Sequence, residues 1–71
     1  MKRPILIKFA KRVKAERKKL GLSQEEFAAK SGFHRTYIGM VERAERNITL
    51  GNIEKLAKAL HLSVSALLKG L

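Results

Sequence analysis

Residues 23–42 read SQEEFAAKSGFHRTYIGMVE, and this stretch decides the fold. Ser23 followed three residues later by Glu26 is the pattern of a capping box, which predicts that a helix begins directly after Ser23. Gly32 comes next, and glycine readily adopts the left-handed backbone conformation that a sharp turn requires. The stretch therefore predicts a first helix over about residues 24–30, a turn at Gly32 and a second helix after it.

The second helix is predicted over about residues 34–43, and its two faces differ in chemistry. Ile38 and Val41 are three residues apart and are expected to point into a core. The opposite face carries Arg35, Thr36, Gly39, Met40 and Arg43. A glycine inside a helix costs about 1 kcal/mol relative to alanine. The presence of Gly39 is explained either by the close approach of a partner or by chance.

A helix over about residues 4–20 is predicted to precede this pair. Pro4 suits the first position of a helix, and Gly21 is a residue that commonly ends one. One face is apolar apart from an arginine and consists of Leu6, Phe9, Ala10, Val13, Arg17 and Leu20. The other face is basic and carries Lys8, Lys11, Arg12, Lys14, Lys18 and Lys19. It is either a solvated surface or one that attracts phosphate.

Two more helices are predicted at the carboxyl end. Thr49 and Ser63 are good N-caps, and Gly70 is placed to end the last helix. The helix after Thr49 has an apolar stripe of helical period, formed by Leu50, Ile53, Leu56, Ala57 and Leu60, which is expected to belong to the core. We therefore predict an all-α fold with five helices, formed as a single domain by residues 1–71. A chain of this size buries only about 60% of its unfolded surface, so the core must be small.

The composition is strongly basic. Sixteen Lys and Arg residues stand against six acidic residues, all of them Glu, and the formal net charge is +10. Residues 1–20 carry nine basic residues and one acid, whereas residues 21–71 carry seven basic residues and five acids. Such a chain is attracted to polyanions, so nucleic acid is the first partner to consider. Together with the polar face after Gly32, the charge points to the DNA major groove.

Several classes of function lack support. Cys is absent, which excludes disulfides and thiolate chemistry, and the two His residues lie far apart in sequence. Because no Gly-rich phosphate loop or cluster of metal ligands occurs, we predict no catalytic residue, no metal and no cofactor. Lys8 and Lys11 interrupt the apolar run at the amino end, and no run approaches the roughly 20 residues that span a bilayer. We therefore expect a cytoplasmic protein that is not an enzyme and has no membrane partner.

Short motifs spread over nearly the whole chain resemble one family. They are Arg-Val-Lys at 12–14, Arg17, Leu-Gly-Leu-Ser-Gln at 20–24, Phe-Ala-Ala-Lys-Ser-Gly at 27–32, Tyr-Ile at 37–38, Val-Glu-Arg at 41–43, Leu-Ala-Lys-Ala-Leu at 56–60 and Ser-Val-Ser-Ala-Leu-Leu-Lys-Gly at 63–70. In order and spacing they are similar to Cro/C1-type helix-turn-helix proteins, also called the Xre family. That family includes phage repressors and the controller proteins of restriction-modification systems, and residues 34–38 and 42–47 look most similar to the controllers.

The resemblance implies a compact, lambda-repressor-like five-helix bundle with its helix-turn-helix at about residues 23–43. It further implies binding as a two-fold dimer, with the second helix of the motif in the major groove. Arg35, Thr36 and Met40 match the positions that reach base edges, where Arg can clasp guanine O6 and N7. Contacts to phosphate or the minor groove are implied for Ser23, Gln24, Tyr37, Arg43, Arg46 and Asn47, with simple solvation as the alternative for those at and after the second helix.

Other residues are expected to have structural roles. Arg17 and Glu42 match a partly buried salt bridge of the family. His34 stands where many relatives have a Ser or Thr cap, and His61 where Gly often ends a helix. Both histidines are expected to be structural, with a pH switch through His34 as the alternative. A dimer interface is expected in about residues 60–71, which offer more apolar surface than one thin helix can turn inward; it comprises Leu60, Val64, Ala66, Leu67, Leu68 and Leu71.

The predicted function is therefore sequence-specific binding of double-stranded DNA by a transcription regulator that acts as a homodimer. The alternative is an antitoxin-like module that binds a partner protein and contacts DNA only secondarily. A neighbouring toxin gene would favour that alternative. Binding to DNA without sequence preference is a third reading, against which the arginine at position 35 argues. The motifs do not distinguish a repressor from an activator.

Overall fold

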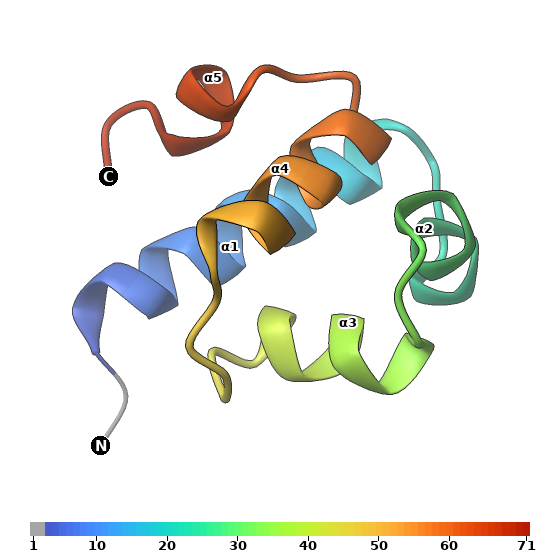
Figure 1. Ribbon diagram of the computed structural model, residues 1–71, viewed down its shortest axis with the longest axis horizontal. Helices are drawn as coiled ribbons and strands as arrows, with labels where there is room; N and C mark the ends of the chain where they lie inside the picture. Colours follow the sequence, from blue (N-terminus) through green and yellow to red (C-terminus); the bar gives the residue numbers. More distant parts are fainter. Residues whose placement is uncertain (1–2) are drawn as a thin grey trace.

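The computed structural model describes residues 3–71, and helices make up most of this part of the chain (Figure 1). They are α1 (Pro4–Lys19), α2 (Gln24–Ser31), α3 (Arg35–Glu42), α4 (Leu50–Ala59) and α5 (Val64–Leu68), and residues 3–71 contain no strand. The prediction of an all-α fold with five helices is confirmed for these residues. Met1 and Lys2, which belong to the predicted domain and its basic amino end, lie outside the described residues.

The predicted local signals mark the beginnings and ends of the helices. At the start of α2, the hydroxyl of Ser23 accepts the backbone N–H of Glu26 at 3.0 Å, and the Glu26 carboxylate accepts the backbone N–H of Ser23 at 2.8 Å. Gly32 ends α2 in the left-handed conformation, with φ of 78°. The side chains of Thr49 and Ser63 cap α4 and α5 by the same type of bond. Each cap satisfies a backbone donor that has no partner within its helix.

The core receives one large, fully buried side chain from each helix. These side chains are Val13, Phe27, Ile38, Leu56 and Leu67, in the order of the helices. Burial of an apolar side chain of this size contributes about 1.5–3 kcal/mol. Because isolated helices shorter than about 12–15 residues are marginal in water, the four shorter helices depend on this shared core.

The apolar stripes extend beyond the packed segments at two helix ends. Leu50 is 75% exposed, and Leu20 is 44% exposed. Leu50 is the first residue of α4 and Leu20 follows the last residue of α1, so both lie at helix ends. The prediction that Leu50 belongs to the core is therefore wrong. The helical period identifies the apolar face of a helix. It does not show how far along that face a neighbouring helix covers it.

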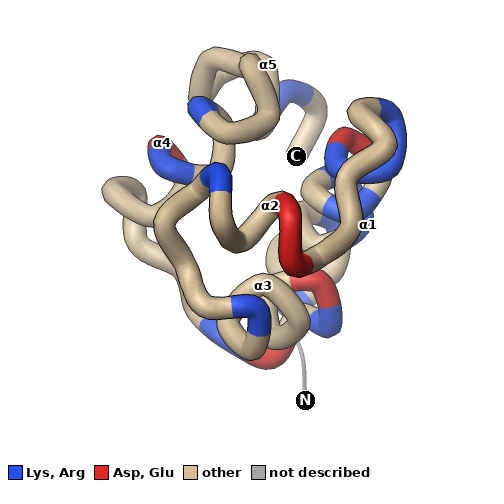
Figure 2. The backbone as a smooth tube through the Cα atoms, turned by 90° about the vertical axis from the view of Figure 1, so that its right-hand side faces the viewer, with Lys and Arg blue, Asp and Glu red and all other residues tan. Residues whose placement is uncertain are grey.

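α3 and α5 lie at opposite ends of the molecule, with α1 and α4 between them (Figures 1 and 2). The described residues measure 28 × 24 × 21 Å along their principal axes. Across residues 3–71 no helix has both the length and the apolar character needed to cross a membrane. The separation means that a partner seated on α3 and a partner seated on α5 would contact different surfaces.

Candidate nucleic-acid interface

The first turn of α3 presents two exposed polar side chains, Arg35 and Thr36. His34 precedes them as the N-cap, and its Nδ1 accepts the backbone N–H of Thr36 at 3.1 Å. An imidazole nitrogen thus supplies the acceptor that Ser, Thr, Asp or Asn usually provides at this position. The cap fixes the start of the helix, and Arg35 and Thr36 extend from it into solvent.

The remainder of α3 is anchored on its apolar side. Ile38 is fully buried and Val41 is 3% exposed, as the spacing predicts. Met40, the third predicted base-reading residue, is partly buried. Because α3 is held by its inner face, the opposite face keeps a fixed orientation in which Arg35 and Thr36 offer more surface than Met40.

Gly39 makes room for Arg43 on the surface of α3. A Cβ atom at Gly39 would lie 3.0 Å from Nη1 of Arg43. The same guanidinium pairs with Glu45, with 3.1 Å between Nε and Oε1. Asn47 lies in the loop between α3 and α4 and is exposed. The Arg43 side chain thus folds back over the helix at Gly39, although this exposed side chain could move aside for a larger residue.

An aromatic and cationic cluster joins α3 to α4 and to the loop between them. The Phe33 and Tyr37 rings lie 4.7 Å apart between centroids, at an interplanar angle of 32°. Arg46 lies over the Tyr37 ring at 5.7 Å, and Lys55 over the Phe33 ring at 5.6 Å. Asn52 Nδ2 donates to the Tyr37 hydroxyl at 3.0 Å. The hydroxyl oxygen is thereby occupied as an acceptor, which leaves its own proton to be donated outward.

The polar side chains at the start of α2 have partners within the chain. Ser23 is engaged in the capping box, and Gln24 Nε2 donates to Glu42 Oε1 at 3.1 Å. The backbone N–H of Ser23 and then its side chain hold the pKa of the Glu26 carboxyl below its usual value, because hydrogen bonds favour the ionised form. A side-chain amide has two N–H groups, so Gln24 keeps one for a further partner.

Arg17 and Glu42 form an ion pair that connects α1 with the end of α3. Arg17 Nε lies 2.7 Å from Glu42 Oε2, and Nη2 lies 3.0 Å from Oε1. The two side chains are only 9% and 3% exposed. Arg17 Nη1 also donates to the carbonyl of Leu22 at 2.8 Å. Together with the bond from Gln24, Glu42 links the first three helices.

Several positions along α1 are basic (Figure 2), and most of its lysines are exposed. Lys8, Lys11, Lys14 and Lys18 are all exposed, and Lys19 is paired with Glu16 at 2.9 Å. Arg12 does not belong to this solvated face, and its predicted placement there is wrong. It is partly buried and directed to the carboxyl end of α5, where it donates three hydrogen bonds to backbone carbonyls.

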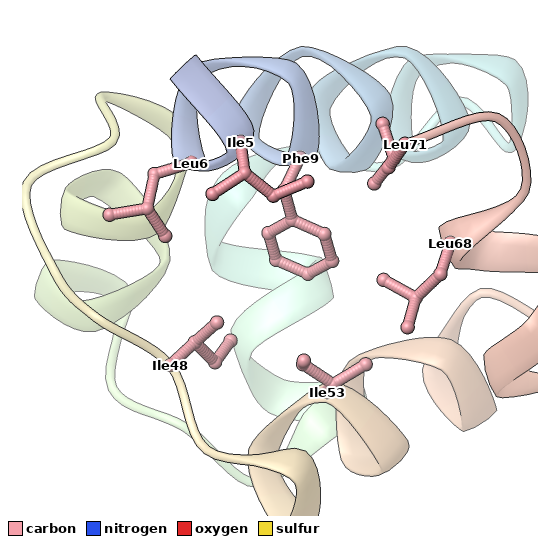
Figure 3. A pocket seen from close by; sticks show the side chains of 7 residues that line it. All are labelled: Ile5, Leu6, Phe9, Ile48, Ile53, Leu68 and Leu71. Carbon is pink, nitrogen blue, oxygen red and sulfur yellow. The ribbon is translucent and has the colours of Figure 1, made fainter. Parts of the chain in front are cut away.

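The predicted interface residues at the carboxyl end occupy two environments. Leu60 and Leu67 are 3% and 0% exposed and belong to the core of the chain itself. Val64, Leu68 and Leu71 are partly buried, and Ala66 is exposed. Between this end, α1 and α4 lies an apolar hollow of about 360 Å³ (Figure 3), which is lined by Ile5, Leu6, Phe9, Ile48, Ile53, Leu68 and Leu71.

The connection from α4 to α5 turns at His61. This residue has φ of 60°, the left-handed conformation that glycine often supplies after a helix. Among residues 3–71, no three His, Cys, Asp or Glu side chains are grouped as they would be around a metal ion. His61 and His34 both lie at helix ends, where His34 caps α3 through its imidazole and His61 has a left-handed backbone.

The roles of two residues that hold parts of the structure together were not predicted from the sequence. Asn52 contacts a side chain 15 positions away, and Arg12 contacts carbonyls 54 to 57 positions away. Contacts of this kind leave no signature in helical period or capping patterns, because those patterns describe neighbours within one helix. From the sequence, Asn52 and Arg12 are recognisable only as polar residues beside the apolar face of a helix.

Comparisons with known proteins agree on one type of fold. Residues 13–67 match the model of the family HTH_3, described as helix-turn-helix. The chain is 56% identical over 59 residues to the control protein C.SmaI of Serratia marcescens, and this alignment covers 83% of the chain and 70% of that protein.

Two solved structures are similar over most of their length. The restriction-modification controller protein C.AhdI from Aeromonas hydrophila is 48% identical, with a TM-score of 0.84, and the match covers 87% of this chain and 94% of that one. The controller protein C.Esp1396I, solved as a tetramer with its natural 35-base-pair operator, is 35% identical with a TM-score of 0.87. That match covers 92% of this chain and 86% of the other.

Proposed function

This chain belongs to the helix-turn-helix family HTH_3, and from that premise we propose that it is a sequence-specific DNA-binding transcription regulator. It acts as a homodimer on a two-fold symmetric operator in the cytoplasm. Its relatives C.SmaI and C.AhdI are named as controllers, the latter of a restriction-modification system, and we propose the same setting for this chain. No catalytic step is part of the proposal.

The observation that carries the proposal is the exposed first turn of α3. Arg35 and Thr36 project from a helix whose start is capped and whose opposite side is buried in the core. An α-helix fits the major groove, and a guanidinium there can donate two bonds to guanine O6 and N7, which discriminates by about 1–3 kcal/mol. Thr36 is suited to a base edge or a thymine methyl group, and Met40 adds apolar contact.

Contacts to the DNA backbone supply most of the affinity in this proposal. Tyr37 donates its free hydroxyl proton to a phosphate, and Arg46 stacked on its ring adds a positive charge beside it. The amino end of α2 offers the remaining N–H of Gln24 and the positive end of the helix dipole, beside the capping Ser23. Arg43 and Asn47 contact the flanking backbone or the minor groove. These contacts set the register but carry little sequence information.

The dimer forms through the carboxyl end of the chain. Val64, Ala66, Leu68 and Leu71 offer apolar surface there, while the buried Leu60 and Leu67 hold this surface from beneath. The hollow of Figure 3 extends the surface toward Ile5, which is 50% exposed. A two-fold dimer presents its two α3 helices to half-sites about 34–36 Å apart, one turn of the double helix.

Selection of bound duplexes from a random DNA library at about 150 mM salt tests the proposal, because nonspecific binding is weak there. The expected result is enrichment of an inverted repeat with half-sites about one helical turn apart. An Arg35→Ala variant selected in parallel is expected to lose the preference at one position in each half-site. Absence of any enriched sequence with folded protein would contradict the proposal and favour a module that binds a partner protein.

A further inference from the structure

Arg12 connects the middle of α1 with the carboxyl end of α5. Its Nη1 donates to the carbonyls of Ala66 and Leu67, each at 3.2 Å. Its Nη2 donates to the carbonyl of Lys69 at 2.7 Å. One guanidinium thus binds three carbonyls in a segment of four residues, which matches the fixed, forked arrangement of its donors.

α5 is a helix that depends on such support. It has five residues, far fewer than the roughly 12–15 that make an isolated helix marginally stable. The last carbonyls of any helix lack partners within it and carry partial negative charge, which a guanidinium complements. Ser63 caps the amino end of α5 and Leu67 fixes its inner side. Leu68 and Leu71 pack against the core, and Arg12 adds hydrogen bonds that tie the carboxyl end to α1.

The segment held by Arg12 also carries the surface assigned to the dimer. Val64 and Leu68 lie on α5, and Leu71 follows three residues after Leu68. Leu68 and Leu71 line one side of the apolar hollow, which is also lined by side chains from the start of α1 (Figure 3). A rotation of α5 would therefore change the shape of this surface, whereas α3 lies at the other end of the molecule (Figure 1).

We propose that Arg12 is a positioning residue for dimerisation: by holding the carbonyls of residues 66, 67 and 69 it sets the orientation of α5, and through it the affinity of the dimer and of the two-fold operator complex. This inference rests on the proposed function. Arg12 contacts no DNA in this scheme, although it is a cation on a basic helix. It acts only through the carboxyl-terminal segment.

The test separates positioning from general stability and from attraction to DNA. Dimer dissociation constants are measured by sedimentation equilibrium, and affinities are measured for the selected two-fold site and for a duplex with one half-site scrambled. Three variants of the full chain are compared with the native protein: Arg12→Ala, Arg12→Lys and Lys14→Ala. Lys14 is exposed on the same helix, so its removal changes the net charge equally without touching α5.

Arg12→Ala is expected to raise the dimer dissociation constant about tenfold and to weaken binding to the two-fold site, while affinity for the single half-site stays within about twofold. Arg12→Lys, which can reach fewer carbonyls at once, is expected to give an intermediate dimer constant. Lys14→Ala is expected to leave the dimer constant unchanged and to weaken both DNA affinities by the same factor per bound chain.

Folded Arg12→Ala protein with a native dimer constant would overturn the inference. So would an equal loss of affinity for the half-site and the two-fold site, which indicates a role in stability alone. If Arg12→Ala does not fold, the dimer dissociation constant of Arg12→Lys becomes the test. A native value for that variant again overturns the inference. A native chain that neither dimerises nor prefers a two-fold site refutes the proposed function itself, and the inference with it.

Discussion

Removal of the Glu42 carboxylate is the most demanding test of the structure. The Glu42 side chain is 3% exposed and accepts bonds from Arg17 at 2.7 and 3.0 Å and from Gln24 at 3.1 Å. In Glu42→Ala the Arg17 guanidinium, itself only 9% exposed, would keep one carbonyl partner and lose its counter-ion. Breaking one side of a buried pair costs about 3–5 kcal/mol, because an uncompensated charge remains inside.

This loss is large compared with the stability of a small domain. Proteins of this size unfold with about 0.05–0.15 kcal/mol per residue, so the variant is expected to lose between about a third and all of its stability. With a urea dependence of about 1–1.5 kcal/mol per molar for a short chain, the unfolding midpoint should fall by about 2–5 M. Urea unfolding followed by circular dichroism at one fixed chain concentration measures this shift, since dimerisation makes the midpoint concentration-dependent.

Two controls distinguish burial from charge. Glu45→Ala removes a carboxylate that pairs with Arg43 at the surface, where the two side chains are 42% and 57% exposed. It should change the free energy of unfolding by no more than about 1 kcal/mol. Arg17→Met combined with Glu42→Leu replaces both charges by apolar groups and should restore most of the loss, because no stranded ion remains. A urea midpoint for Glu42→Ala within about 0.5 M of the native value would refute the reasoning, since a buried ion pair cannot be broken at so small a cost.

Three further predictions concern the start of α3, the hydrogen bond between α3 and α4, and the start of α2. Arg35→Ala is expected to lower the discrimination between the selected operator and a duplex changed at one guanine by about 1–3 kcal/mol, measured by competition binding; unchanged discrimination would remove Arg35 from base reading. Asn52→Ala is expected to weaken operator binding in the native chain but not in a Tyr37→Phe background, because Asn52 acts through the Tyr37 hydroxyl; a double-mutant cycle with additive effects would contradict this. The pKa of Glu26 is lowered by its bonds from Ser23, so its contribution to stability is present above the ordinary pKa of glutamate and is lost as the pH falls through the lowered value. Unfolding measured from neutral to acidic pH should therefore depend less on pH in Glu26→Gln, and identical pH profiles would argue against the bond to the carboxylate.

The local structure around the turn was determined by the sequence itself. The capping box at Ser23 and Glu26, the left-handed Gly32 and the caps at Thr49 and Ser63 all depend on residues within three or four positions of one another. Interactions of such short range involve only residues close in sequence, so patterns read from the chain alone identified where helices begin and end. The inward faces of α3 and α4 followed from helical period in the same way, except at Leu50.

Only the tertiary structure decided which polar side chains are occupied and which are free. Arg12 and Lys14 are two cations on one helix, yet one binds the carbonyls of α5 and the other is exposed. Leu67 and Leu68 are adjacent leucines, yet the first is fully buried and the second borders the hollow of Figure 3. Helical period places a residue on a face, but its partner there comes from a segment tens of residues away. The free energy of such contacts depends on how whole helices pack, and that packing is a property of the complete chain.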